Sequence, residues 1–162
     1  MKDFLLIANT NACTYKEFFP LLKERKVSMG VEMPKEYYMP DGTTKKFGNI
    51  CWYTTLHTPD KKKLVLTKKY SHKLYPHYVN YNAIEVSRVK DIPYDYECVM
   101  AVPITIFGYD LDNIEILDCK EPALTMNDID ALGITEYPSR QINHNGKKCQ
   151  KTYHRIMIKK RL

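Results

Sequence analysis

The hydrophobic pattern changes character along the chain. Residues 4–8 form a continuous apolar run, which predicts a strand buried on both faces, typical of a parallel sheet. Residues 27–31 predict a second short strand, and residues 15–24 between them have apolar positions at helical spacing. Strand, helix and strand within about thirty residues match the size of one crossover unit. The chain is therefore predicted to open as part of an α/β sheet.

The predicted helix has a start signal and an obstacle. Thr14 and Glu17 have capping-box spacing, but Pro20 lies too deep for a first turn that begins at Thr14. Proline inside a helix removes a backbone hydrogen bond and clashes with the preceding turn. The helix is therefore predicted either to kink at Pro20 or to restart with Pro20 at its first position.

Beyond residue 35 the pattern favours strands and turns. Pro103 requires an edge position or a bulge in its strand, and Thr125 to Gly133 bracket a short helix. No repeat or linker is visible, so we expect a single domain, residues 1–162, with an α/β start over 1–35 and a β-rich part over 36–162. The predicted strands are 49–56, 63–66, 83–86, 99–107 and 152–158, and the predicted turns are 40–42 and 143–146.

Composition adds limits on the class of protein. The chain has 162 residues, of which 44% are hydrophobic and 27% charged, as in an ordinary globular domain. No apolar run approaches the ~20 residues that cross a bilayer, so we expect a soluble, cytoplasmic protein with no membrane partner. The five cysteines are odd in number and lack a CxxC pair, which predicts reduced thiols and no zinc site.

The net charge of +6 is unevenly distributed. From Asp91 to Asp130 the chain has ten acids and one base, whereas from Pro138 onward it has eight bases and no acid. Lysines 61–63 and 68–69 form another basic cluster. Segregated charge of this kind suits a polyanion on one face, although a well-solvated lysine-rich surface would have the same composition.

Tyrosines gather in one loop-like stretch. Tyr70, Tyr75, Tyr78 and Tyr81 lie among histidines, asparagines and a proline. Such rings beside lysines could stack on bases, or they could form a small core under a long loop. Trp52 lies on a predicted strand whose alternation puts it on one face with Ile50 and Thr54, so it is predicted to be a core residue.

A metal-dependent phosphodiesterase pattern can also be assembled. Asp60, Asp118 and Lys120 are the residue types that would hold a metal ion and steady a hydroxide. Short patterns of this kind are common by chance. A nuclease is therefore only an alternative function, and no catalytic or metal-binding residue is assigned.

Six segments, in one order, resemble the EcoRI-type adenine-specific DNA methyltransferases of restriction–modification systems. They cover nearly the whole chain. The segments are FLLIANTNA (4–12) with YKE (15–17), FGNICWYT (47–54), YPHYVNYNAIEV (75–86), KDIPYDY (90–96), MAVPIT (100–105), and the closing pair NGK (145–147) and YHRIMI (153–158).

The resemblance implies transfer of a methyl group from S-adenosylmethionine to adenine in duplex DNA. Family members carry an earlier half with a Gly-rich cofactor loop and an Asn-Pro-Pro-Phe catalytic turn, and this chain has no Pro-Pro dipeptide. The resemblance thus implies the C-terminal part of a Rossmann-like methyltransferase sheet, followed by a β-rich target-recognition region with returning sheet strands. By itself this chain is expected to bind no S-adenosylmethionine and to transfer no methyl group, with an N-terminal catalytic half as its missing partner.

A methyltransferase must flip its target base out of the stack, so the recognition part needs residues that grip phosphates and read base edges. Two alternatives to a part of an enzyme stay open: a free-standing DNA-binding protein, and an assembly subunit whose basic face only confers solubility. The candidates for DNA contact are Lys61, Lys62, Lys63, Lys68 and Lys69 for phosphates, and Tyr78, Asn80, Tyr81 and Asn82 for bases.

Overall fold

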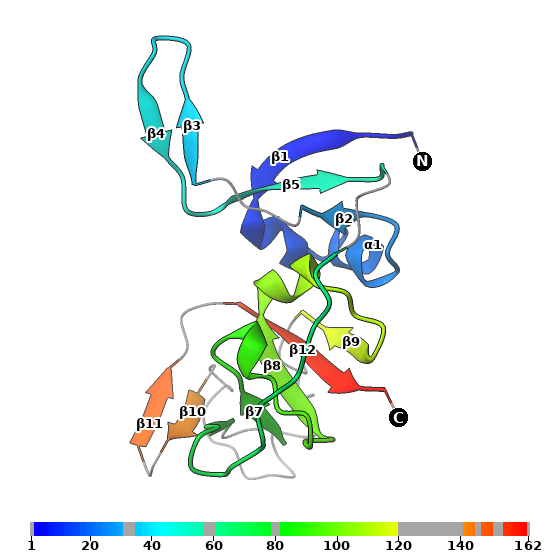
Figure 1. Ribbon diagram of the computed structural model, residues 1–162, viewed down its shortest axis with the longest axis vertical. Coiled ribbons are helices and arrows are strands. Elements are labelled where there is room, and N and C mark those ends of the chain that lie inside the picture. Colours follow the sequence, from blue (N-terminus) through cyan, green and yellow to red (C-terminus); the bar gives the residue numbers. More distant parts are fainter. Residues whose placement is uncertain are drawn as a thin grey trace. The chain divides into compact units, whose positions relative to one another are not determined.

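The chain has a mixed α/β structure with several sheets and few helices. The computed structural model describes residues 2–30, 35–56, 61–78, 82–119, 141–144, 147–150 and 154–161 (Figure 1). Two compact units can be separated: unit 1 comprises residues 1–63 and 107–110, and unit 2 comprises residues 64–106 and 111–162. Over the described ranges, no helix is long and apolar enough to cross a membrane.

Unit 1 is built on a three-stranded antiparallel sheet. Its order is β1 (Leu5–Asn9), β5 (Ile50–Thr54), β2 (Ser28–Met29). A short 3₁₀ helix, Thr10–Thr14, and α1 (Phe19–Lys23) connect β1 to β2. The predicted order of strand, helix and strand is confirmed. However, β5 pairs antiparallel with both strands and separates them, so the Rossmann-like assignment stays a prediction.

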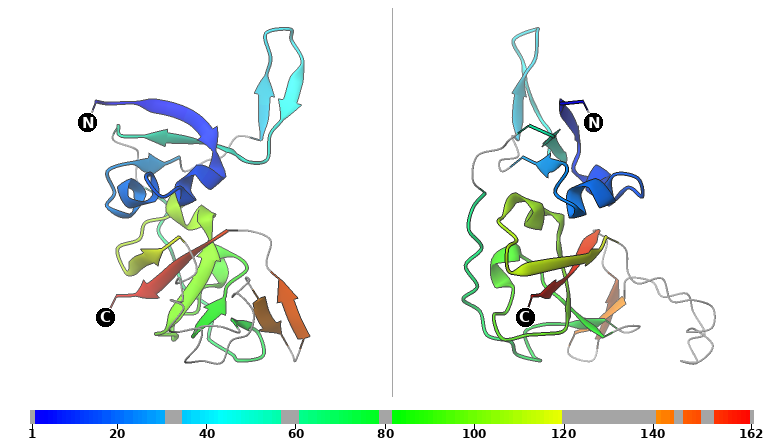
Figure 2. Two further views of the ribbon diagram at one scale, coloured as in Figure 1. Left: turned by 180° about the vertical axis from the view of Figure 1, so that it is seen from behind. Right: turned by 90° about the vertical axis from the view of Figure 1, so that its right-hand side faces the viewer.

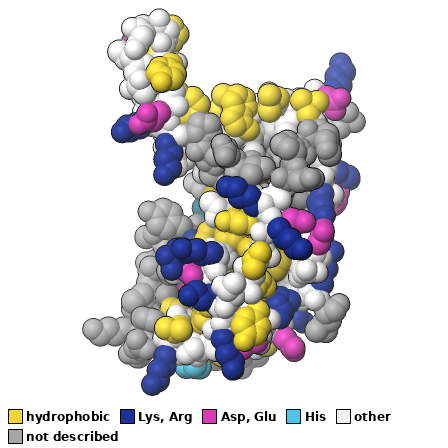
Figure 3. All heavy atoms as spheres, in the orientation of Figure 1, with side chains coloured by type: hydrophobic (Ala, Val, Ile, Leu, Met, Phe, Trp, Pro, Cys, Tyr) yellow, Lys and Arg dark blue, Asp and Glu magenta, His cyan; other side chains and the backbone are white. Residues whose placement is uncertain are grey.

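The prediction that residues 4–8 are buried on both faces was wrong. β1 is an edge strand with one neighbour, and Leu5 and Ile7 remain about half exposed, at 57% and 49%. Figure 3 shows a row of hydrophobic side chains over this strand. A continuous apolar run does not by itself reveal whether a strand has one neighbour or two.

The connection between β1 and β2 resolves the conflict at Pro20. The helix begins at Phe19, with Pro20 in its first turn, where a missing N–H costs nothing. This confirms the restart and excludes the kink. Thr14 is not the N-cap of α1, because that helix begins at Phe19 with Phe18 before it. The Thr14 hydroxyl donates to the carbonyl of Asn11, and the side chain of Asn9 caps the 3₁₀ helix.

Tyr53 organises the core of unit 1. Its side chain is fully buried, and its ring meets Phe18 edge-on, with centroids 4.9 Å apart. The hydroxyl accepts from the backbone N–H of Cys13 at 3.1 Å and donates to the carbonyl of Thr10 at 3.0 Å. The prediction that Trp52 lies on the core-facing side of this strand was therefore wrong. Cys51 and Tyr53 face the core, and Trp52 is half-buried.

The predicted Pro-Asp-Gly turn closes a separate hairpin in unit 1. Strands β3 (Glu36–Tyr38) and β4 (Thr44–Lys46) form a two-stranded sheet of their own, which the views in Figure 2 show extending away from β5. Gly42 has φ +78°, a left-handed conformation that glycine adopts without a Cβ clash. The turn prediction is confirmed.

Unit 2 is a seven-stranded sheet that is almost entirely antiparallel. Among the strands that the structure describes, only β7 and β8 run parallel, and the crossover between them contains a 3₁₀ turn at Val89–Asp91. The order is β11 (Lys147–Gln150), β10 (Gln141–His144), β6 (His77–Tyr78), β7 (Ala83–Glu85), β8 (Val99–Pro103), β12 (Arg155–Lys160), β9 (Ile114–Asp118).

The centre of this sheet is buried on both faces. Ile84, Met100 and Ile158 are 0% exposed on one face, and Ala101 and Met157 are 0% and 2% exposed on the other. Pro103 was predicted to need an edge strand or a β-bulge, and it has neither. It is the last residue of the interior strand β8 and is followed directly by a 3₁₀ helix, Ile104–Gly108. The strands predicted at 83–86 and 152–158 are confirmed within a few residues.

Of the remaining predictions, the strand at 63–66 was wrong, and two others fall on residues that the structure does not describe. Residues 63–66 form no strand, and only isolated bridges at Lys62 and Lys68 tie this stretch to neighbouring segments. The four cysteines whose side chains are described, Cys13, Cys51, Cys98 and Cys119, are not joined in a disulfide. The predicted helix at 125–133 and the centre of the predicted turn, Asn145-Gly146, lie outside the described residues.

We predict that Tyr53→Phe lowers the free energy of unfolding of unit 1 by about 1–3 kcal/mol, because it leaves the buried N–H of Cys13 without its acceptor. Denaturant titration measures the loss. Tyr15→Phe is the control, since Tyr15 is 57% exposed in the same unit. Equal stability of the two variants would contradict the role assigned to the hydroxyl.

Candidate nucleic-acid interface

An exposed basic segment lies along unit 2. Lys68, Lys69, His72 and Lys73, here called the basic run, are all exposed. The backbone of this segment is attached to residues 93–95: the carbonyl of Lys68 accepts from the N–H of Tyr94 at 2.9 Å, and the N–H of Tyr70 donates to the carboxylate of Asp95 at 2.6 Å. The lysines therefore extend from a fixed backbone.

Aromatic side chains support the basic run from the protein side. Tyr70, Tyr75, His77 and Tyr96 form what we call the tyrosine cluster. The ring of Tyr70 lies 4.6 Å from that of Tyr96 and 5.9 Å from that of Tyr75, and its hydroxyl is 2.9 Å from Nε2 of His77. The Tyr75 hydroxyl donates to the carbonyl of Asp91 at 2.7 Å. Of the four tyrosines of this stretch, Tyr75 and Tyr78 are buried as a small core under a loop requires, Tyr70 is half-buried, and Tyr81 lies outside the described residues.

Burial sets the ionisation of the tyrosine cluster. It raises the pKa of Tyr70 and Tyr75, and it raises the pKa of Tyr96 to about 12. Burial also lowers the pKa of His77, and the imidazole of His72, stacked at 4.6 Å, lowers it further. The tyrosine cluster is thus uncharged at neutral pH, so the positive charge of this region comes from the lysines.

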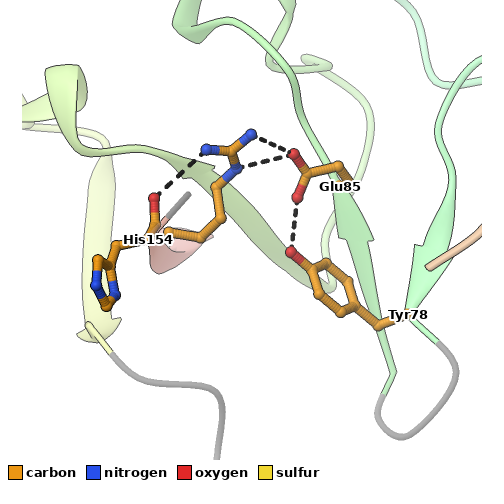
Figure 4. A network of polar contacts seen from close by, with 4 residues as sticks. Tyr78, Glu85 and His154 are labelled. Carbon is orange, nitrogen blue, oxygen red and sulfur yellow. Dashed lines mark hydrogen bonds and ion pairs between the residues drawn. The ribbon is translucent and has the colours of Figure 1, made fainter. Parts of the chain in front are cut away.

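A buried ionic network holds the strands next to this segment (Figure 4). The carboxylate of Glu85 on β7 accepts from the Tyr78 hydroxyl at 2.6 Å. Its other oxygen accepts from Arg155 Nε at 2.8 Å and pairs with Nη2 at 2.7 Å. The side chain of Glu85 is 0% exposed and that of Arg155 12%. The network joins β6, β7 and β12.

A small residue makes this network possible. β8 lies between β7 and β12, and Ala101 on β8 is opposite both Glu85 and Met157. Because alanine carries only a methyl group, the carboxylate of Glu85 can reach across β8 to Arg155. A buried carboxylate is tolerated only when it is paired in this way.

The structure sorts the predicted phosphate contacts into two groups. Lys62, Lys63, Lys68 and Lys69 are exposed. Lys61 is half-buried, and its ammonium donates to the carbonyl of Phe107 at 2.9 Å. Burial lowers the pKa of Lys61. This lysine is engaged within unit 1, so we no longer include it among the phosphate contacts.

The predicted base contacts are also divided. Tyr78 was predicted to meet DNA, but its ring is 6% exposed and its hydroxyl is bonded to Glu85, so it belongs to the core. Asn82 is exposed at the residue before β7. Asn80 and Tyr81 lie outside the described residues.

Asp118 is the one residue of the predicted nuclease pattern that the structure describes, and its surroundings do not support that pattern. Asp118 ends β9, and its carboxylate accepts from the N–H of Cys119 at 2.6 Å. Asp60 and Lys120 lie outside the described residues. Among the residues that are described, no group of three or more His, Cys, Asp or Glu side chains is placed to hold a metal ion.

The roles of Glu85 and Arg155 in the buried network, and of Lys73 in the basic run, were not predicted from the sequence. Glu85 and Arg155 are 70 residues apart, and no local spacing signals such a pair. A usable signal existed for Glu85, because it interrupts an apolar strand that is otherwise buried on both faces. Lys73 could have been included with Lys68 and Lys69, since it follows within five residues.

Comparison with known proteins gives one consistent result. A family model described as "Adenine-specific methyltransferase EcoRI" matches residues 1–161. The chain is 36% identical over 180 residues to "Type II methyltransferase M.EcoRI" of Escherichia coli, covering 98% of this chain and 50% of that protein. It is 30% identical over 189 residues to "Type II methyltransferase M.MpnI" of Mycoplasma pneumoniae, covering 99% and 57%. The chain thus spans about half the length of these relatives. No solved structure matches.

We predict that Glu85→Ala destabilises unit 2 by about 3–5 kcal/mol, because it leaves the guanidinium of Arg155 buried without its partner. Removing both charges in Glu85→Ala/Arg155→Met should recover most of that loss. The control is Arg88→Ala, which breaks the more exposed pair with Asp91 and should cost less than about 1 kcal/mol. Denaturant titration of the variants checks this, and a Glu85→Ala loss no larger than the control's would refute it.

We also predict that acid weakens unit 2 through His77. Its folded-state pKa lies below 6.5, so the unfolded chain takes up the proton first, and the free energy of unfolding falls as the pH drops below about 6.5. His77→Gln should remove this part of the pH dependence, and His72→Gln should only reduce it. Unfolding measured between about pH 5 and 8 tests both, and an unchanged slope in His77→Gln would show that other groups are responsible.

Proposed function

The chain belongs to the EcoRI family of adenine-specific methyltransferases, and from this membership we propose that it supplies the DNA-recognition part of an enzyme that methylates adenine in duplex DNA with S-adenosylmethionine. The relatives are Type II methyltransferases. Methyl transfer, the cofactor and the DNA target are the activity that we infer for the whole protein. DNA contact is the share that we assign to this chain.

The main observation behind the proposed DNA contact is the basic run, whose backbone is held in place beside the tyrosine cluster. Lys68, Lys69 and Lys73 are exposed, and among the residues described no carboxylate forms an ion pair with any of them. An ammonium without a partner is free to bind a phosphate and to release the counterions condensed on DNA. The fixed backbone beneath it reduces the conformational entropy lost on binding.

Recognition requires more than phosphate contacts. A base must leave the stack before its amine can react, so the protein has to hold the duplex in one register. Asn82 is an exposed amide three residues before Glu85 in the sequence, and asparagine can bond adenine through two atoms at once. We propose Asn82 as a base contact, and Lys62 and Lys63 as further phosphate contacts on unit 1.

The connection from β1 to α1 does not have the composition of a Gly-rich cofactor loop. The connection from β1 to α1, residues 10–18, contains no glycine, so its backbone carries a Cβ at every position where a cofactor would approach closely. The proposal therefore assigns no step of methyl transfer to these residues. It assigns them the binding and orientation of DNA.

We predict that the chain binds duplex DNA with a strong salt dependence that originates in the basic run. Lys68→Ala/Lys69→Ala should flatten the plot of log affinity against log salt by up to about 0.9 per lysine. Fluorescence anisotropy with a labelled duplex at a series of salt concentrations gives the slope.

The matched control is Lys16→Ala/Lys23→Ala, which removes the same charge from two exposed positions of unit 1. Equal effects of the two double variants would mean that only net charge matters. A chain that shows no salt-dependent binding at all would instead favour the assembly-subunit alternative.

A further inference from the structure

The β3–β4 hairpin of unit 1 has an organisation that the unit's own core does not explain. Five of the six strand residues are exposed, and Tyr37 is the exception. Tyr38, near the turn, is 89% exposed. An isolated two-stranded hairpin is marginally stable in water at best, so a sequence that keeps one ordered without burying it has another use for it.

The turn of the hairpin is strongly pre-organised. One carboxylate oxygen of Asp41 accepts from both the N–H and the hydroxyl of Thr43, at 2.9 and 2.6 Å, and these bonds lower the pKa of Asp41. The backbone closes the turn with bonds from Met39 N–H to Thr43 and from Gly42 N–H to Met39, at 2.8 and 3.0 Å. The tip therefore keeps its shape without support from the core.

The two faces of the hairpin differ. Tyr37 meets Phe47 edge-on, with centroids 5.5 Å apart, and these half-buried rings stiffen one face. Tyr38 lies on the opposite face, across from Thr44, with Lys46 two residues further along. Lys35, Lys45 and Lys46 are exposed, and the Lys46–Glu36 pair is open to solvent at 80% and 56% exposure. Such a pair is weak enough to exchange for a phosphate.

From this arrangement we propose that the β3–β4 hairpin is a second DNA-contacting element, a two-stranded ribbon that enters the major groove with Tyr38 against the bases and Lys35, Lys45 and Lys46 against the phosphates. The major groove is about 12 Å wide and admits a two-stranded ribbon. The inference rests on the proposed function, since it takes duplex DNA as the partner. It adds a contact surface on unit 1 to the basic run of unit 2.

The test compares Tyr38→Ala with Tyr15→Ala in DNA binding by the full chain. Both tyrosines are exposed in unit 1, at 89% and 57%, so the chemical change is matched. Tyr38→Ala should weaken binding by about fivefold or more, since an apolar contact with base edges in the major groove is lost, and should leave the salt dependence unchanged. Tyr38→Phe should restore affinity, and Tyr15→Ala should bind as the parent chain does.

A direct readout accompanies the affinities. Duplexes that carry 5-iododeoxyuridine should cross-link to Tyr38 on irradiation, and mass spectrometry locates the attachment. Unchanged thermal unfolding of Tyr38→Ala shows that the loss of affinity is not a loss of fold.

The outcomes separate this inference from the proposed function. If the parent chain binds DNA but Tyr38→Ala binds equally well, or weakens no more than Tyr15→Ala, the hairpin inference is overturned and the proposed function stands. If the parent chain does not bind DNA, both fall. If Tyr38→Ala changes only the oligomeric state in sedimentation, the hairpin is a contact between copies of the chain, and the DNA assignment is overturned.

Discussion

The buried carboxylate of Glu85 is the constraint on which unit 2 depends. A charge removed from water must find a partner, and the guanidinium of Arg155 and the hydroxyl of Tyr78 are the partners that the fold provides. Meeting this requirement fixes three strands at once, because the three residues come from β6, β7 and β12. It also fixes the register of β7, since a shift by one residue would turn the carboxylate to the opposite, apolar face.

The surfaces that we assign to DNA follow from such fixed points. Strand β6 begins at His77, a member of the tyrosine cluster, and the next residue, Tyr78, belongs to the ionic network. The basic run is therefore tied to the sheet through the cluster on its inner side. The hairpin of unit 1 is mostly exposed, and its turn is ordered by local hydrogen bonds. Of the two proposed DNA-contacting surfaces, the one on unit 2 is held by burial and the one on unit 1 by local hydrogen bonds.

Turns and helix starts were predicted well from the sequence, but the pairing of strands and the buried face of each strand were predicted poorly. The turn at 40–42 and the helix restart at Pro20 were predictable because their causes lie within a few residues. Strand β5 was placed correctly, yet its buried face was not, because alternation shows that two faces differ without showing which one is covered. Burial on both faces was expected at residues 4–8 and occurs instead in β7, β8 and β12, since the number of neighbouring strands depends on distant pairing.

The same limit applies to the candidate site. Lys68 and Lys69 were identified from charge alone, and the structure leaves them exposed. Tyr78 was also chosen for its residue type and its place in the sequence, but it is a core residue. Its hydroxyl bonds to Glu85, and Glu85 in turn pairs with Arg155 on β12, so its role depends on residues far away in the sequence. Lys61 looked like its neighbours but donates to a carbonyl 46 residues away. Composition indicated a polyanion-binding surface, and only tertiary contacts show which side chains remain available for it.

The position of β12 has a consequence for synthesis of the protein. This strand lies between β8 and β9, although it follows β9 by more than thirty residues. At translation rates of about 5–20 residues per second, β8 and β9 wait roughly 2–7 s for the strand that joins them. During that interval their inner edges are open and the carboxylate of Glu85 has no arginine. Synonymous codons between residues 118 and 155 would therefore set how long these strand edges and the unpaired carboxylate are exposed in the nascent chain.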